Sequence, residues 1–174
     1  MSNIILTSNN VDSKAELIER LKNSEVETIL LGGKSQQSQG FIEMTVKDSY
    51  ADAELLRIGV IYEGHGLKPQ YSINEFEKLI IGFNKEICLV SLDSLDKLLK
   101  KEFKSLFYEF KFIKNLNLIV VVCETEIYCL NANLETVWQV CLDLIIEHEI
   151  TDEYIKVVTE EETRVLSLVN GKLI

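Results

Sequence analysis

The sequence predicts an α+β fold, in which a mostly antiparallel β-sheet is accompanied by two or three short helices. The main observation is a weak repeat of about 40 residues in the C-terminal two-thirds of the chain. Each repeat has an apolar strand, a short polar turn and a second apolar strand, at residues 79–90, 118–130 and 154–168. We expect one domain, 1–174, with a mixed α/β part at 1–75 and a β-meander with one inserted helix at 76–174.

Three segments have the spacing or the capping residues of a helix. Ser13 to Lys22 begins with Ser13 and Glu16, which form a capping box, and its apolar residues share one face. Asp48 to Leu56 is a candidate short helix capped by Asp48. Ser94 to Phe103 places its leucines and its phenylalanine on one side, as a helix inserted into the meander would.

Strand patterns account for most of the remaining residues. The predicted strands are 3–7, 26–31, 41–46, 57–62, 79–83, 86–90, 106–113, 118–123, 126–130, 136–141, 143–150, 154–159 and 164–169. The segment 118–123 is apolar on both faces and is therefore predicted to be a central strand. Asn170-Gly171 is typical of a type I′ turn, and three residues follow it.

The second repeat is the most complete. After its two apolar strands come Leu130-Asn131-Ala132-Asn133, a strand with Val137-Trp138, and the apolar segment 143–146. This order resembles one four-stranded blade of a propeller repeat. A closed propeller typically has four or more blades, and the chain supplies fewer. We therefore expect an antiparallel sheet, curled or folded on itself, with helices against one side.

Composition limits the classes of function. Hydrophobic residues make up 47% and charged residues 26% of the 174 residues, as in a globular protein. No apolar run approaches the roughly 18 residues of a membrane span, and the start lacks the features of a signal peptide, so we expect a cytoplasmic protein. The net charge of −10 disfavours nucleic acids and anionic membranes as partners and suits a basic protein.

The four cysteines are predicted to be buried, reduced thiols. Cys88, Cys123, Cys129 and Cys141 lie in predicted strands among apolar neighbours, and no Cys-x-x-Cys pair occurs. With only two histidines in the chain, a histidine-rich metal site is impossible. We therefore predict no metal and no cofactor.

Negative charge concentrates in the last third of the chain. The candidate partner-binding residues there are Asp143, Glu147, Glu149, Asp152 and Glu153. Such carboxylates are either a solvated face, which also discourages aggregation, or a docking surface for a basic protein. Alternation places His148 on the face of Ile146 and opposite Ile145, so we expect a core-edge histidine with a polar neighbour. Trp138 is expected to pack in the core.

Two loops suggest other chemistry. Gly32-Gly33-Lys34-Ser35 follows a strand, but Thr28 stands where a phosphate-binding loop has its first glycine, and no helix pattern follows. His65 lies between two glycines in the loop Glu63 to Pro69, where it has the flexibility of a general base. No partner nucleophile is recognisable nearby, so catalysis at His65 is an alternative and not the main prediction.

We therefore predict a non-enzymatic protein-interaction module of the cytoplasm with a basic partner. In size and charge the chain is similar to small acidic bacterial immunity proteins, which neutralise basic nuclease toxins. One alternative is an enzyme with a site around His65. The other is a structural subunit that forms homo-oligomers by adding strands at the C-terminal edge, where Leu173 and Ile174 lie.

Overall fold

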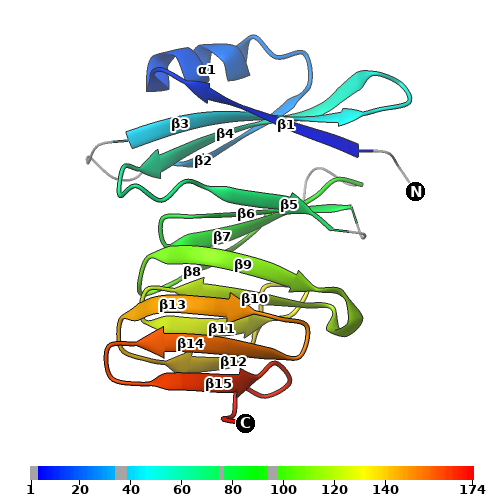
Figure 1. Ribbon diagram of the computed structural model, residues 1–174. Helices are drawn as coiled ribbons and strands as arrows, with labels where there is room; N and C mark the ends of the chain where they lie inside the picture. The colour runs from blue at the N-terminus through cyan, green and yellow to red at the C-terminus, as the bar shows by residue number, and fades with distance from the viewer. Residues whose placement is uncertain (1–3, 34–38, 75–76, 94–97) are drawn as a thin grey trace. The chain divides into compact units, whose positions relative to one another are not determined.

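A computed structural model describes residues 4–33, 39–74, 77–93 and 98–174 (Figure 1). These residues contain fifteen β-strands, one α-helix and one 3-10 turn, and the strands form four small sheets. The predicted α+β class with two or three helices is therefore wrong, because the described chain is mostly β, although most strand pairs are antiparallel as expected. None of the helical segments in the described ranges is long and apolar enough to cross a membrane.

The chain divides into two compact units. The first comprises Met1–Lys68, Glu75–Glu77 and Ser91–Asp96, and the second comprises Pro69–Asn74, Lys78–Val90 and Lys97–Ile174.

The first unit is a four-stranded sheet with one helix. Its elements are β1 (Ile4–Val11), α1 (Lys14–Lys22), β2 (Glu27–Gly32), β3 (Gln39–Asp48) and β4 (Ala53–Glu63). The sheet order is β1-β3-β4-β2, with β2 parallel to β4 and the other pairs antiparallel. The hairpin β3–β4 thus lies between the two strands that α1 connects.

Helix α1 confirms the predicted N-cap at Ser13, while the Glu16 carboxylate pairs with Arg20 and does not complete a capping box. An apolar face holds the helix on its sheet. The Ser13 hydroxyl accepts a hydrogen bond from the Glu16 backbone N–H at 3.2 Å. Leu17 and Leu21 are buried and form a cluster with residues of β1 and β4. Because α1 is only nine residues long, packing of this face contributes more to its stability than helix propensity does.

The second predicted helix, Asp48 to Leu56, is wrong. The Asp48 carboxylate accepts from the backbone N–H groups of Tyr50 and Ala51, at 2.8 and 3.3 Å, and so stabilises a turn. Strand β4 begins directly afterwards at Ala53 and pairs with β3. The aspartate does satisfy orphan N–H groups, as a cap would, but the chain reverses into a hairpin.

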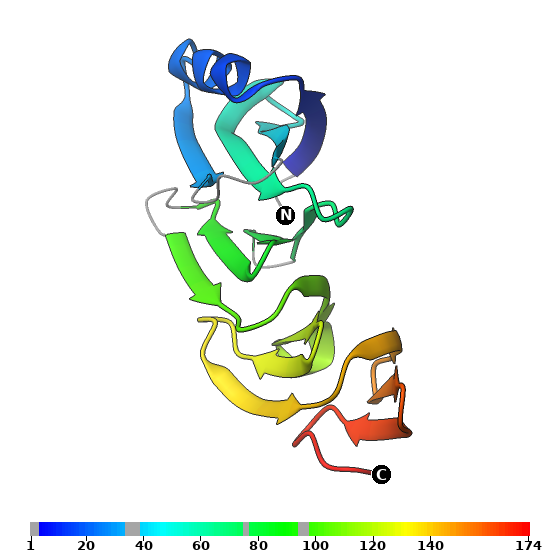
Figure 2. The same cartoon turned by 90° about the vertical axis from the view of Figure 1, so that its left-hand side faces the viewer.

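The second unit contains three meander sheets, which the chain visits in order (Figure 2). The first meander sheet has β5 (Gln70–Ile73), β6 (Lys78–Phe83), β7 (Glu86–Ser91) and β8 (Leu98–Glu102). The second has β9 (Phe107–Ile113), a 3-10 turn (Lys114–Leu116), β10 (Leu118–Cys123), β11 (Glu126–Leu130) and β12 (Thr136–Cys141). The third has β13 (Ile145–Ile150), β14 (Tyr154–Thr159) and β15 (Thr163–Ser167). Four-stranded meanders of this kind form propeller blades.

The 40-residue repeat corresponds to these three sheets. Each repeated segment is a hairpin at the same place in its sheet: β6–β7, β10–β11 and β14–β15. The blade-like unit was predicted one strand out of phase, since the strand at 143–150 starts the third sheet and β9 completes the second. After the Asn170-Gly171 turn, Leu173 pairs with Leu166, so the last residues stand in the position of a fourth strand.

The predicted helix Ser94 to Phe103 is also wrong over its described part. Leu98–Glu102 is β8, which pairs with β7 from Val90↔Leu98 to Glu86↔Glu102, while residues 94–97 lie outside the described ranges. The spacing of the leucines fitted a helix, but the ladder with β7 and the burial of Phe103 in the core fix an extended chain.

Two apolar clusters hold the meander sheets together. One joins the first and second sheets and includes Ile87, Leu89, Phe110 and Val121. The other joins the second and third sheets and includes residues of β10, β14 and β15. The meander sheets therefore pack face to face in sequence, and the third sheet has one face in a cluster and one face outside it.

Candidate functional site

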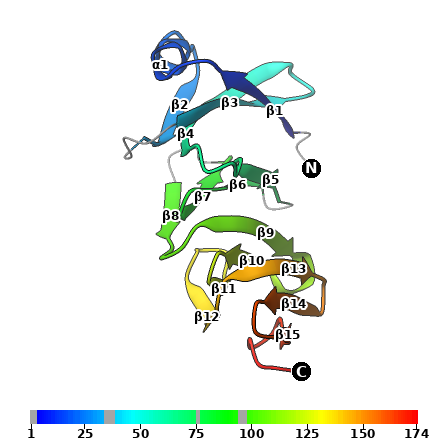
Figure 3. The same ribbon diagram turned by 60° about the vertical axis from the view of Figure 1, so that its left-hand side comes forward.

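The third meander sheet separates its residues into an inner and an outer face. On the inner face Ile155 pairs with Leu166, and both are buried in the cluster shared with the second sheet. Strand residues alternate between faces, so Lys156 and its partner Val165 lie on the outer face. Figure 3 shows β14 in the middle of this sheet, between β13 and β15.

A β-bulge in β13 determines which of its side chains face outward. The register shifts between Ile145, which pairs with Thr159, and Glu147, which pairs with Val158. Ile145 is consequently 3% exposed and Ile146 56% exposed. The alternation predicted from sequence is wrong for these two isoleucines. It is correct for the residues beyond the bulge, because Glu147 and Glu149 lie on the outer face.

His148 points to the inner side of the sheet. Its Nε2 lies 2.7 Å from the Glu109 carboxylate on β9, and its side chain is 18% exposed. This confirms the prediction of a core-edge histidine with a polar neighbour. The contact links β13 to the second meander sheet.

We define the outer face of the third sheet by Glu147, Glu149, Tyr154, Lys156, Val158 and Val165. A shallow pocket of about 110 Å³ on it is lined by Glu147, His148, Glu149, Lys156 and Val158. Tyr154, Val158 and Val165 are half-buried, whereas the three charged residues are exposed. Among the described residues, the side chains of Glu147, Glu149 and Lys156 form neither an ion pair nor a hydrogen bond.

The other predicted site residues lie at the two ends of β13. Asp152 and Glu153 are in the β13–β14 turn, where the Asp152 carboxylate lies 3.0 Å from Lys111 Nζ. Asp143 precedes β13. Its charge acts on Arg164, whose pKa is raised first by a hydrogen bond to Glu162 and further by Asp143. The structure therefore groups Glu147 with Glu149 and separates Asp143 from them.

The structure describes the surroundings of His65 and of Gly32-Gly33, the two loop sites suggested by the sequence. His65 Nε2 lies 2.6 Å from the Glu63 carboxylate, and the His65 side chain is 37% exposed. Gly32 and Gly33 both have positive φ angles, and residues 34–38 lie outside the described ranges. The next described element is the strand β3, whereas a phosphate-binding loop leads into a helix N-terminus. Within the described ranges, no group of three potential metal ligands occurs.

Three of the four cysteines are buried as predicted, and Cys141 is exposed, which corrects the fourth. Burial raises the pKa of the Cys88 thiol to about 12 and that of Cys129 to about 11, and it raises the pKa of Cys123 too. A thiol with a raised pKa is a poor nucleophile, because the thiolate is the reactive form. The buried cysteines therefore serve as small apolar core residues.

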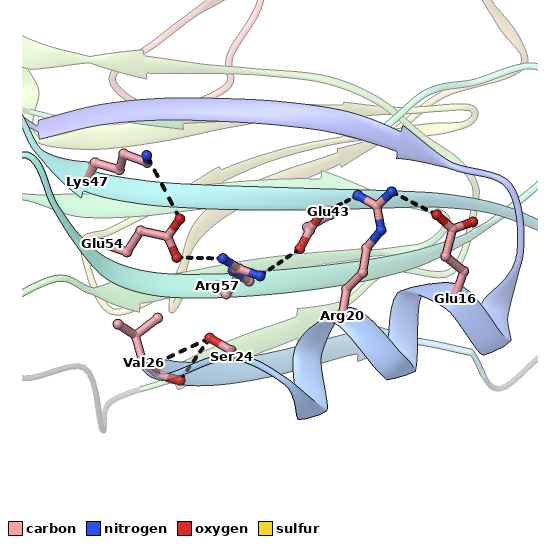
Figure 4. Close-up of polar contacts among 8 residues, drawn as sticks. All are labelled: Glu16, Arg20, Ser24, Val26, Glu43, Lys47, Glu54 and Arg57. Atoms are coloured by element: carbon pink, nitrogen blue, oxygen red, sulfur yellow. Dashed lines mark hydrogen bonds and ion pairs between the residues drawn. The ribbon is translucent and has the colours of Figure 1, made fainter.

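Two buried carboxylates, Glu43 and Glu126, were not identified from the sequence. Glu43, whose side chain is 7% exposed, lies 2.9 Å from Arg20 and 3.5 Å from Arg57 (Figure 4). Glu126, 3% exposed, accepts hydrogen bonds from Ser105 and Gln139, both at 3.2 Å. Both carboxylates are satisfied within the fold. The first links α1 to its sheet and the second joins strands of the second meander sheet, so neither is a free binding group.

The outer face also contains residues that the sequence analysis did not single out. Lys156, Val158 and Val165 occupy it together with the two predicted glutamates. The sequence did contain a sign of this face in the strand Tyr154-Ile155-Lys156-Val157-Val158. Alternation places Tyr154, Lys156 and Val158 on one face of the sheet and Ile155 and Val157 on the other.

Comparisons with known proteins identify a fold and no family. No protein-family model matches this chain, and no curated protein sequence matches it. The structure of apo AztD from Citrobacter koseri is 14% identical with a TM-score of 0.53, over 83% of this chain and 44% of that chain. A structure of S. cerevisiae Dbp5 bound to Nup159, Gle1, IP6 and ADP contains a chain that is 9% identical with a TM-score of 0.52, over 100% of this chain and 49% of that chain. This chain thus spans less than half the length of either match, and the likeness concerns the fold alone.

Proposed function

We propose that this protein is a non-enzymatic, cytoplasmic protein-interaction module, and that a basic protein partner binds the outer face of its third meander sheet. The observation that carries the proposal is the combination on this face of two unpaired carboxylates, Glu147 and Glu149, with three half-buried apolar or aromatic residues. A solvated sheet face needs neither the pocket nor the apolar residues.

The charges and the apolar residues have separate roles in this proposal. The net charge of −10 attracts a basic protein over a distance, and the carboxylates orient it. The buried part of an interface supplies most of the affinity, and Tyr154, Val158 and Val165 are available for that purpose. In size and charge the chain is similar to small acidic bacterial immunity proteins, which neutralise basic nuclease toxins.

The proposal is tested by affinity purification from the lysate of the native host, with elution by rising salt and identification by mass spectrometry. The test variant is Glu147→Gln with Glu149→Gln. The control variant is Glu160→Gln with Glu161→Gln, which removes the same charge from the exposed β14–β15 turn. We expect a basic protein that the wild type and the control retain and the test variant loses. Equal retention by all three proteins would contradict binding at the outer face.

A further inference from the structure

We propose that the edge strand β1 is the docking site for a second copy of this chain, with the two β1 strands paired antiparallel across a two-fold axis. This pairing joins two four-stranded sheets into one continuous sheet. β1 belongs to the first unit, whereas the outer face assigned to a basic partner belongs to the second. The inference therefore goes beyond the proposed function and leaves that face to its single occupant.

The first step of the argument is the lack of protection along β1. Among the described strands only β3 pairs with β1, so β1 is an edge strand. It runs for eight residues, Ile4–Val11, without a charged residue or a proline, and its register with β3 has no bulge. Proteins usually protect an edge by charge, proline, a bulge or a short strand, because an open edge recruits further strands. β1 has none of these features.

The second step compares β1 with the other described edge strands, each of which has at least one protective feature. β5 has only four residues, and the registers of β12 and β13 shift at a bulge. β8, β9 and β15 contain charged residues, and β2 begins with Glu27. At the edge of β15, Leu166 also pairs with Leu173. Of the edges that the structure describes, β1 is thus the one best suited to strand addition.

The third step is the register, which the side chains of β1 indicate. Ile5 is 48% exposed, whereas Val11 on the same face is 6% exposed in the cluster with α1. A two-fold axis perpendicular to the sheet, passing beside Ser8, sets Ile5 opposite the partner's Val11 and Thr7 opposite the partner's Asn9. All four side chains then lie on one face. Ile5 loses contact with water, which favours this register over one that sets Ile5 opposite a polar residue.

The fourth step is that this edge suits an identical copy. Because β1 has no charged side chain, two copies bring no like charges together within the strand pair. Main-chain hydrogen bonds supply the affinity of strand addition, and alternate side chains supply its specificity. The net charge of −10 on each molecule opposes association at long range, and salt screens this repulsion. We therefore expect a monomer–dimer equilibrium that higher salt shifts toward the dimer.

Sedimentation equilibrium of the full chain, from micromolar to millimolar concentration, tests this proposal. The wild type should approach the dimer mass as concentration rises. Thr7 and Asn9 are exposed, and Thr7→Lys with Asn9→Lys sets like charges directly opposite each other on both sides of the axis. This variant should raise the dimer dissociation constant at least about fivefold. The two added lysines make the net charge less negative, so greater repulsion between whole molecules would not explain a weaker dimer.

Thr7→Lys with Asn9→Glu is the matched control, because a lysine then faces a glutamate across the axis and the net charge is that of the wild type. This control should dimerise at least as well as the wild type. Circular dichroism shows whether each variant is folded. Hydrogen exchange followed by mass spectrometry locates the interface, since amide protection in β1 should increase with protein concentration and protection in β13, β14 and β15 should not.

The proposal is overturned if the wild type stays monomeric throughout, or if the variant with two lysines dimerises as the wild type does. It is also overturned if the control stays monomeric, or if the concentration-dependent protection lies outside β1. None of these measurements involves a basic protein, and their variants lie in the first unit. Their failure is therefore distinguishable from a failure of the proposed function, whose test variant lies in β13.

Discussion

Two sheet faces of the second unit have the same backbone pattern but differ in how far their side chains are buried. The face of the second meander sheet that meets the third sheet presents Val120, Val122 and Ile127, all fully buried. The corresponding outer face of the third sheet presents Lys156, Val158 and Val165, of which Lys156 is exposed and the valines half-buried. Both faces come from a β-meander with the same strand order.

The difference shows that the residue at one position, Val120 in the second sheet and Lys156 in the third, can determine whether a sheet face is buried in the core. The backbone ladder satisfies the peptide groups in both sheets, so it does not distinguish them. Removing apolar area from water stabilises the Val120 face, while Lys156 at the equivalent place makes complete burial costly. The outer face nevertheless keeps the half-buried Val158 and Val165 beside Lys156.

Substitutions at the two central residues, Val120 and Lys156, should show the largest difference between the faces. Val120→Lys puts a charge into the cluster between two sheets and should destabilise the protein by at least ~3 kcal/mol. Lys156→Val removes an exposed charge and should change the free energy of unfolding by less than ~0.5 kcal/mol. Urea unfolding followed by circular dichroism measures both. Similar losses for the two variants would show that the outer face is as buried as the inner one.

A second exchange compares the two faces of β15 alone. Leu166→Ala leaves a cavity in the cluster with the second sheet and should cost ~2–4 kcal/mol. Its neighbour Val165 lies on the outer face, so Val165→Ala should cost less than ~1 kcal/mol. Thermal and urea unfolding of both variants give the two values. If Val165→Ala were as costly as Leu166→Ala, residues in the isolated chain would have to cover Val165.

The repeated part of the fold was predictable because its sequence pattern is long and consistent. The hairpins β6–β7, β10–β11 and β14–β15 each have apolar strands around a polar turn, and the sheets form there as expected. The phase of the sheets was not predictable, since a meander of equally spaced strands gives no local sign of where one sheet ends. The helix predicted at 48–56 was wrong because an aspartate that caps a turn and one that begins a helix look alike in sequence. The helix predicted at 94–103 was wrong over residues 98–103, because pairing with β7 overrides the helical spacing.

The candidate site was predictable only in its charges. Glu147 and Glu149 share a face as strand alternation requires. The bulge after Ile145 reverses the preceding residues, and a bulge leaves no clear mark in the sequence. The roles of Lys156 and Val165 depend on which face meets the second sheet. That is a tertiary property, and alternation alone allows either face to be the buried one.

The C-terminal turn provides a smaller perturbation of the third sheet. Gly171 has φ +67, and a Cβ there would lie 2.7 Å from a ring carbon of Trp138. Trp138 in turn donates its Nε1–H to the Leu168 carbonyl at 2.8 Å. Gly171→Ala should therefore cost ~1–3 kcal/mol, from backbone strain and the displaced ring. Tryptophan fluorescence during urea unfolding reports it. A variant as stable as the wild type would show that the turn does not depend on this contact, and Lys172→Ala nearby serves as the control.

The mildest test uses a thiol as a probe of each face. Cys129 and Ser167 occupy equivalent positions, on the covered face of the second sheet and on the outer face of the third. Burial raises the pKa of Cys129 to about 11, whereas a cysteine in place of Ser167 would face the half-exposed surface. With a chromogenic disulfide at pH about 8, the folded wild type should titrate one thiol, the exposed Cys141, and Ser167→Cys should titrate two. Rapid reaction of Cys129 in the folded wild type would mean that the third sheet does not cover it.

Because burial raises the pKa of Cys129, the free energy of unfolding should depend on pH in the alkaline range. The folded protein keeps the Cys129 proton up to about pH 11, while in the unfolded chain the thiol ionises near its usual pKa of 9.0. Above pH 9.0 the unfolded state binds fewer protons than the folded state, so the free energy of unfolding falls as pH rises from there to about 11. Cys129→Ala should be less stable at pH 7 but should lose less on going to alkaline pH. Cys141→Ala serves as the control for removing an exposed thiol. If Cys129→Ala and the wild type lost the same free energy of unfolding at alkaline pH, the Cys129 thiol would not be shielded from water in the folded protein.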